Sequence, residues 1–275
     1  MKSGIDGKIL KQLHRHNGKL GFYRVLKSIG YERSAELSYV VGLLQDRFDR
    51  PLDLLDIGTG DSVLPSFFLA KTNWNIWCVD KFSWVKKQSQ YASRVAPGKI
   101  RNLHVVERDF LDFHPDSLFD VVSCISVIEH FEGNLDSRAM AKAATLLRPG
   151  GIFIVTTPVN EGHSKNFFRA GKVYGAYSQG GTFYQRHYDA ASLHARLIAP
   201  SGLTEVHRMY FGEFGFPFGE KFLFPRLAKN PFKVFYKWLA PYFAKRFLSY
   251  SDSPISKPDM PVDTASGVIL VLRKV

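Results

Sequence analysis

The sequence has little cysteine and no long hydrophobic run. Only Cys78 and Cys124 are cysteines among its 275 residues, which is too few for a disulfide framework. Both fall within predicted core strands, so we expect buried thiols in a reducing compartment. No window approaches about 18 unbroken apolar residues, which argues against a transmembrane helix. The first residues also lack the apolar stretch of a secretory signal. We therefore expect a cytoplasmic protein.

Acidic residues are fewer than basic ones. The chain has 25 Asp and Glu against 37 Lys and Arg, a formal net charge of +12. Such a balance favours polyanionic partners such as RNA, anionic lipid headgroups or phosphorylated substrates. A basic surface without any such partner fits the composition equally well, so composition alone leaves the partner open.

A strand, a glycine turn and a helix follow one another near residue 58. The apolar run 52–57 has no helical period, which predicts a strand buried on both faces. It ends in Gly58-Thr59-Gly60, where the missing side chains make a positive φ inexpensive. In an α/β fold, such a turn lets a ligand contact bare backbone at the end of the first strand. Asp56 adds a carboxylate there, although a tight turn without any ligand would look similar.

A second predicted strand ends at Asp80, 24 residues after Asp56. A carboxylate at the tip of the second strand is the group that holds a ribose diol in dinucleotide-binding folds. We therefore predict cofactor contacts from Asp80 and the adjacent Lys81. This pattern fits either a nicotinamide cofactor or S-adenosylmethionine.

The order of the motifs resembles that of the class I S-adenosylmethionine-dependent methyltransferases, most of all their small-molecule, methyltransferase type 11-like branch. The resemblance covers roughly residues 50–160. A nicotinamide site would normally need a third glycine, and Ser62 and Val63 stand there instead. Five segments carry the resemblance: Leu54-Leu-Asp-Ile-Gly-Thr-Gly60, Val79-Asp80, Arg108-Asp-Phe110, Phe119-Asp-Val-Val-Ser-Cys-Ile-Ser-Val-Ile-Glu-His-Phe131 and Leu147-Arg-Pro-Gly-Gly151.

The resemblance implies a fold and a cofactor. The fold is α/β and Rossmann-like, a seven-stranded, mostly parallel sheet with helices on both faces and an antiparallel seventh strand. The cofactor is S-adenosylmethionine, with S-adenosylhomocysteine as product. In the family, residues at the positions of Asp109 and Phe110 bind the adenine, and Ser126 would line the methionine part.

The segment after the fourth strand carries the catalytic candidates. His130 is the best candidate for a general base, because its ordinary pKa lies near neutrality. Glu129 would hold that histidine or bond to backbone. A structural His130 that only orients its loop is an alternative reading. No Cys/His spacing typical of a metal site is present, so we expect no metal.

Residues 158–187 read as an irregular loop, rich in Gly, Ser, Asn and aromatic residues. Long loops at the carboxyl ends of strands are usually lids or binding loops, so we expect substrate contact there. The candidates are Tyr174, Tyr177, Tyr184, Arg186 and His187.

Around this core the chain divides into three parts. Residues 1–50 read as helices, with a third helix capped by Ser34. Residues 51–210 and 266–275 form the cofactor-binding domain. Residues 211–265 are an aromatic and basic insertion, predicted to be a helical cap. Its segment 229–248 also fits a helix lying on a membrane surface, or a helix that binds a protein partner.

The sequence therefore predicts an S-adenosylmethionine-dependent methyltransferase that acts on a sugar, a lipid-linked compound or a secondary metabolite. An RNA methyltransferase is the alternative suggested by the net charge, but the Asn/Asp-Pro-Pro-Tyr/Phe signature and an RNA-binding module are missing, so nucleic acid is not expected as a partner. A non-catalytic cofactor-binding scaffold is a second alternative. Sequence does not define the acceptor, the methylated atom or the oligomeric state.

Overall fold

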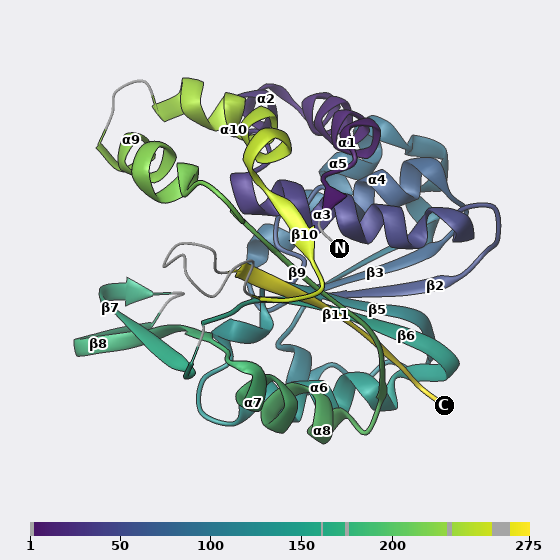
Figure 1. Ribbon diagram of the computed structural model, residues 1–275. Helices are drawn as coiled ribbons and strands as arrows, with labels where there is room; N and C mark the ends of the chain where they lie inside the picture. Colours follow the sequence, from purple (N-terminus) through teal and green to yellow (C-terminus); the bar gives the residue numbers. More distant parts are fainter. Residues whose placement is uncertain (1–2, 161, 174–175, 230–232, 255–264) are drawn as a thin grey trace.

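The described part of the chain folds around one central sheet of nine strands, in the order β1-β10-β9-β11-β6-β5-β2-β3-β4 (Figure 1). The computed structural model describes residues 3–160, 162–173, 176–229, 233–254 and 265–275. The strands of the sheet are β1 (Ser3–Gly4), β2 (Asp53–Ile57), β3 (Asn75–Asp80), β4 (Leu103–Glu107), β5 (Phe119–Ile125), β6 (Leu147–Pro158), β9 (Thr204–Gly212), β10 (Ser249–Ser251) and β11 (Ala265–Arg273).

Five strands form the parallel part of the sheet. β2 pairs with β3 on one side and with β5 on the other, and β4 and β6 extend these pairs in parallel. From β2, the chain adds β3 and β4 toward one edge of the sheet, and then β5 and β6 on the other side of β2. The strand order therefore has a switch point between the neighbouring strands β2 and β5. In open α/β sheets, the carboxyl ends of the strands at such a switch point form the ligand-binding crevice.

The expected antiparallel last strand is confirmed, whereas the expected count of seven strands is wrong. β11 lies between β6 and β9 and runs antiparallel to both. Two short strands, β10 and β1, continue the sheet beyond β9. The extra edge forms because the insertion returns along β9, where the hydroxyl of Tyr250 donates to the carbonyl of Ala35 at 2.7 Å.

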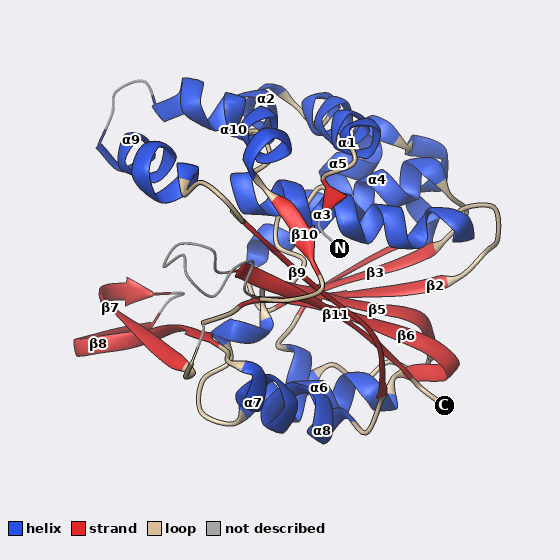
Figure 2. Cartoon of the chain, in the orientation of Figure 1, coloured by secondary structure: helices blue, strands red, loops and turns tan. Residues whose placement is uncertain are grey.

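Helices cover both faces of the sheet (Figure 2). Adjacent residues of one strand serve different layers: Leu54 belongs to the core beneath α1, α3 and α4, and Leu55 to the core above α6. This alternation follows from the two-residue period of a strand. The helices are α1 (Gly7–Lys19), α2 (Phe22–Lys27), α3 (Tyr31–Leu44), α4 (Leu64–Lys71), α5 (Lys87–Val95), α6 (Leu135–Thr145), α7 (Ala190–Ser192), α8 (Ala199–Ser201), α9 (Phe224–Lys229) and α10 (Lys233–Phe247).

The predicted amino-terminal helices are present, with shifted boundaries. The Asp6 carboxylate caps α1 by accepting from the backbone N–H groups of Lys8 and Ile9 at 2.7 and 3.2 Å. Ser34 does not cap the third helix as expected. It lies in the first turn of α3, where its hydroxyl donates to the carbonyl of Gly30 at 2.8 Å. Cys78 and Cys124 are buried free thiols, as predicted.

The segment 158–187, expected to be irregular, forms an antiparallel hairpin. Its strands are β7 (Lys165–Val173) and β8 (Ala176–His187), which pair with each other and with no other strand of the described chain. Cross-strand aromatic contact accompanies the pairing, because the rings of Phe168 and Phe183 meet edge to face at 5.9 Å. Figure 1 shows the hairpin extending from the end of the sheet that carries the glycine turn.

The insertion packs on the amino-terminal helices. α10 contacts α2 and α3, and its inward residues Ala240 and Ala244 are buried in the same core as α1 and α3, together with Leu248 just after the helix. The helix expected over 230–248 is therefore observed from Lys233 and contains Pro241. Residues 230–232 lie outside the described part. No helix in the described residues is long and apolar enough to cross a membrane.

Candidate functional site

A cavity of about 840 Å³ lies at the carboxyl ends of β2, β3 and β5, walled on one side by α2 and α3. This is where the switch point between β2 and β5 predicts a ligand-binding crevice. The nine residues predicted to contact a cofactor all line it, and so does His130. They are Asp56, Gly58, Thr59, Gly60, Asp80, Lys81, Asp109, Phe110 and Ser126.

The glycine turn brings bare backbone to the cavity. Gly58 and Gly60 have φ values of +67° and +55°, which side-chain-bearing residues rarely adopt. A Cβ atom added to Gly58 would lie 2.3 Å from Cγ1 of Val127, so no side chain fits there without displacement. The turn is held by the Gly58 N–H, which donates to the carbonyl of Val79 at 2.7 Å.

The Asp80 carboxylate organises the neighbouring loop. Oδ2 accepts from the Gly60 N–H at 2.9 Å and from the Trp84 indole at 3.2 Å, and Oδ1 accepts from the Phe82 N–H at 2.9 Å. Burial raises the pKa of Asp80 above its ordinary value. Two carboxylate oxygens offer about four acceptor sites, so capacity remains for a hydroxyl donor from the cavity.

Asp56 lies beneath the turn and joins two strands. Its carboxylate is 4% exposed and accepts from the hydroxyl of Ser123 on β5 at 2.6 Å. Burial raises the pKa of Asp56 to about 6. The hydroxyl of Thr59 donates to the Asp56 carbonyl at 2.7 Å, so the turn is fixed to the end of β2.

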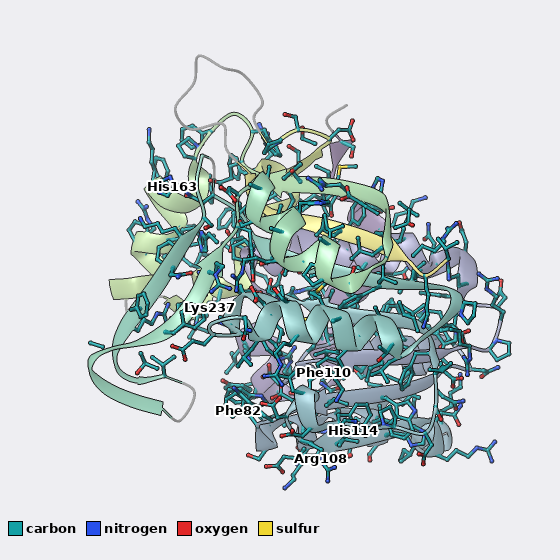
Figure 3. The ribbon with its side chains drawn as sticks, turned by 90° about the horizontal axis from the view of Figure 1, so that it is seen from below. Phe82, Arg108, Phe110, His114, His163 and Lys237 are labelled. Carbon is teal, nitrogen blue, oxygen red and sulfur yellow. The ribbon has the colours of Figure 1, made fainter. Side chains whose placement is uncertain are left out.

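Asp109 and Phe110 form the wall predicted for an adenine. The Asp109 side chain accepts from the Leu111 N–H at 2.9 Å and thereby caps a short 3-10 helix, Phe110–Asp112. Phe110 presents a nearly buried ring to the same cavity, and Phe82 faces it from the loop after β3. Both rings are labelled in Figure 3, where Arg108, just after β4, lies nearer the rim of the molecule.

These features fit S-adenosylmethionine. The glycine turn exposes backbone to the cavity, Asp80 can still accept hydrogen bonds, and Phe110 offers an apolar face for a flat ring. Ser126, with an unusual φ of +48°, continues the wall toward His130. Cofactor binding by these residues stays a prediction that the cavity supports.

His130 ends the 3-10 helix Ile128–His130 directly after β5. Its Nδ1 lies 2.6 Å from the carbonyl oxygen of Tyr184 on β8. A carbonyl only accepts, so Nδ1 carries the proton and the lone pair of the neutral ring is on Nε2. Burial lowers the pKa of His130, which keeps the ring neutral at pH 7 and able to take a proton.

Glu129 lies behind the cavity wall and does not line it. The side chain is 3% exposed, its Oε1 is 3.9 Å from Nε2 of His130, and its Oε2 has no hydrogen-bond partner among the described residues. Burial raises the pKa of Glu129 to about 8. A carboxyl that is mostly protonated at pH 7 is a poor electrostatic partner for an imidazolium, so this arrangement gives the expected pairing of Glu129 with His130 little electrostatic support.

The three substrate candidates whose side chains the structure describes, Tyr184, Arg186 and His187, are not among the residues that line the cavity. Arg186 is 6% exposed, and its Nη1 donates to Oδ2 of the buried Asp136 at 2.5 Å. Nε2 of His187 accepts from the side-chain amide of Gln185 at 2.6 Å. Tyr184 packs its ring against the His130 ring at 5.3 Å and under the Arg169 guanidinium at 3.4 Å. Tyr174 and the side chain of Tyr177 lie outside the described residues.

Sequence reasoning missed the contribution of α3. The hydroxyls of Ser126 and of Thr156, the latter at 2.6 Å, donate to the buried Glu36 carboxylate. Arg33 lines the cavity and donates from Nη1 to the carbonyl of Ile125 at 2.8 Å. The available signal was the charged pair Arg33 and Glu36, three residues apart in the first half of α3. Among the described residues, no group of three His, Cys, Asp or Glu side chains is placed to bind a metal ion.

Comparison with protein families matches residues 30–201 to a model described as "Methyltransferase domain". Among curated proteins, the chain is 27% identical over 162 residues to a ubiquinone biosynthesis O-methyltransferase of Rickettsia akari (strain Hartford). The match includes 56% of this chain and 61% of that relative, so the chain spans less than two thirds of its length.

Two solved structures share the fold at low sequence identity. Coclaurine N-methyltransferase bound to N-methylheliamine and SAH superposes with a TM-score of 0.58 at 15% identity, over 97% of this chain and 86% of that one. The 1,6-didemethyltoxoflavin-N1-methyltransferase of Burkholderia thailandensis, with its substrate and S-adenosylhomocysteine, gives 0.53 at 16% identity over 86% and 77%. These likenesses establish the Rossmann-like α/β fold.

Proposed function

This chain belongs to the methyltransferase domain family, within the class I S-adenosylmethionine-dependent superfamily, and from that premise we propose that it transfers a methyl group to a small-molecule acceptor. The observation that carries the proposal is the cavity at the ends of β2, β3 and β5, where all nine predicted cofactor residues meet His130. The conclusion rests on this convergence, since fold alone does not determine function.

S-adenosylmethionine supplies a methyl group activated by a sulfonium and is converted to S-adenosylhomocysteine. The residues of this chain that would hold it are the glycine turn, Asp80 for the ribose, and Asp109 with Phe110 for the adenine. Methyl transfer depends mainly on proximity and alignment, so a dense set of catalytic groups is not needed.

We propose that His130 takes up the proton that the methyl acceptor loses. With Nδ1–H donating to the Tyr184 carbonyl, the ring is fixed in position and Nε2 can accept a proton from the acceptor. A hydroxyl must lose its proton during methylation, so this arrangement favours an oxygen acceptor. The name of the Rickettsia relative, an O-methyltransferase, agrees with that assignment. Membrane contact through 229–248 and a cytoplasmic location remain predictions.

Calorimetric titration with S-adenosylmethionine and S-adenosylhomocysteine tests the cofactor site. We expect micromolar binding to cofactor-free protein, and a loss of at least about tenfold, or 1.4 kcal/mol, in Gly58→Ala. Gly133→Ala is the matched control, because its φ is +62° but a Cβ there meets nothing within 4 Å. Both variants carry the backbone strain, whereas only Gly58→Ala disturbs the cavity wall at Val127. No binding to the wild type, or equal losses in both variants, would overturn the assignment.

A further inference from the structure

Large apolar side chains are exposed on three helices that lie together. α10 contacts both α2 and α9, and Figure 1 shows the three along the edge of the molecule opposite α6–α8. The exposed residues on these helices are Phe22 (79%), Tyr23 (65%), Val25, Leu26, Phe224, Val234, Phe235 (56%), Trp238 (48%) and Tyr242 (70%). We call this the α2–α10 surface. Single exposed apolar residues are ordinary, but a group of this size on adjoining helices marks an interaction site.

α10 is apolar on two faces. Ala240 and Ala244 point into the core shared with α1 and α3. Val234, Trp238 and Tyr242 follow one another at four-residue spacing, so they share a face of the helix, and all three are exposed. A helix that only capped the domain would need one apolar face. The second face is therefore unexplained by the packing of the described residues. None of the described residues of the insertion lines the cavity either.

The sequence that contains α9 and α10 carries charges of one sign. Between Lys221 and Phe247 the chain has seven basic residues and no acidic one. They are Lys221, Arg226, Lys229, Lys233, Lys237, Lys245 and Arg246. On α2, Arg24 is buried, and Lys27 is more exposed and forms an ion pair with Asp61. Lys237, Lys245 and Arg246 are exposed beside the aromatic face of α10.

We propose that the α2–α10 surface docks the protein on a membrane that contains anionic lipids. Its aromatic rings would enter the boundary between headgroups and acyl chains, while the basic side chains contact phosphates. Trp and Tyr suit that boundary because one part of each ring system is apolar and the other polar. Lysine is depleted from protein–protein interfaces but frequent on membrane-binding helices, so a lipid surface fits this composition better than a protein partner.

α2 connects the docking surface to the cavity. Tyr23, Arg24 and Lys27 line the cavity, and Lys27 forms an ion pair at 2.6 Å with Asp61, which follows the glycine turn. The membrane would therefore lie beside the cavity wall. This part rests on the proposed function: the acceptor class is then a molecule with an apolar tail that resides in the membrane, with its reacting hydroxyl near the headgroups.

Vesicle co-sedimentation of the full chain tests the docking. The probes are phosphatidylcholine vesicles with and without phosphatidylglycerol. We expect binding to the anionic vesicles, at least about tenfold weaker in the double variant Trp238→Ser/Tyr242→Ser, because burial of two aromatic side chains is lost. Phe168→Ser is the matched control, since Phe168 is 60% exposed but lies on the β7–β8 hairpin. It should bind like the wild type.

Charge reversal gives a second, independent readout. Lys237→Glu/Arg246→Glu should weaken binding by at least about fivefold for each basic residue lost, and added salt should weaken the wild type in the same direction. Thermal unfolding and S-adenosylhomocysteine titration confirm that each variant is folded. Absence of vesicle binding by the wild type, or full binding by both double variants, overturns the docking proposal. A protein that binds vesicles but no cofactor would instead refute the proposed function and leave the docking intact.

Discussion

At the scale of single residues, one backbone contact determines which ring nitrogen of His130 is protonated. The Tyr184 carbonyl fixes the proton on Nδ1, and burial keeps the ring neutral at physiological pH. Nε2 is then the atom available to an acceptor proton. The same contact joins the loop after β5 to the hairpin, so the position of the proposed base depends on β8.

His130→Asn tests this role. The Asn amide can still donate to the Tyr184 carbonyl, but it offers no basic nitrogen. We expect kcat to fall by about 10²- to 10⁴-fold with an unchanged affinity for S-adenosylhomocysteine. Because burial lowers the pKa of His130 below 6.5, wild-type kcat should be flat from neutral to mildly alkaline pH and should fall under acidic conditions. A variant with wild-type kcat would show that no general base is used.

Glu129 gives a prediction about stability. Its pKa is raised to about 8 by burial, from an ordinary value of 4.5, so the folded state keeps a proton that the unfolded state releases. The free energy of unfolding therefore falls as pH rises from 4.5 to 8. Glu129→Gln removes this titration, and its stability relative to the wild type should rise with pH, by at most about 1.4 kcal/mol per unit.

Urea unfolding at several pH values within that window measures the difference. A constant difference between Glu129→Gln and the wild type would mean that Glu129 ionises in the folded state much as it does in the unfolded chain. The Gln side chain keeps the size of the protonated carboxyl, so a change in packing contributes only a pH-independent offset.

How far the sequence predicts these residues depends on where their partners lie. Gly58, Gly60 and Asp80 were identified because a strand and a turn define them locally. The contact of Arg33 and Glu36 with Ser126 and β6 joins segments about a hundred residues apart, and no local pattern records it. The position of α3 beside the cavity could therefore not be predicted from the sequence.

At the scale of elements, the β7–β8 hairpin depends on a buried ion-pair network. Asp136 on α6 is fully buried and accepts from Arg186 on β8, from Arg196 at 2.7 Å and from the Tyr188 hydroxyl at 2.9 Å. Sequence reasoning placed Arg186 in a substrate site because the loop lacked periodicity. Its fifty-residue separation from Asp136 hides the pairing that orders the strand.

Asp136→Asn should lower the free energy of unfolding by about 3–5 kcal/mol, because two arginines lose their buried counter-charge. Glu205→Gln is the matched control. It breaks the ion pair of Glu205 with Arg208, in which both side chains are roughly one quarter exposed, and should cost less than about 1 kcal/mol. Thermal or urea unfolding measures both. Equal losses would show that the network contributes no more than a surface pair.

At the scale of the whole molecule, the sequence predicts the parallel strands of the sheet more completely than the short edge strands and the helices around them. Each parallel strand is a short apolar run with a turn after it, so its position is a local property. β1 and β10 are too short to carry a pattern of their own, and they pair only because the insertion folds back along β9. The apolar residues of α10 are likewise visible as a periodic pattern in the sequence. Which of them are covered and which are exposed is determined by the packing of α10 against α3.

The most direct test of the proposed function is methyl transfer from S-adenosylmethionine carrying a labelled methyl group, with cell extract as the source of acceptors. After incubation, the label is counted separately in small molecules, lipids, RNA and protein. We expect label in the small-molecule or lipid fraction, and we expect that label to be lost in Gly58→Ala but not in Gly133→Ala. Label confined to RNA or protein, or no transfer by an enzyme that binds the cofactor, would contradict the proposed function.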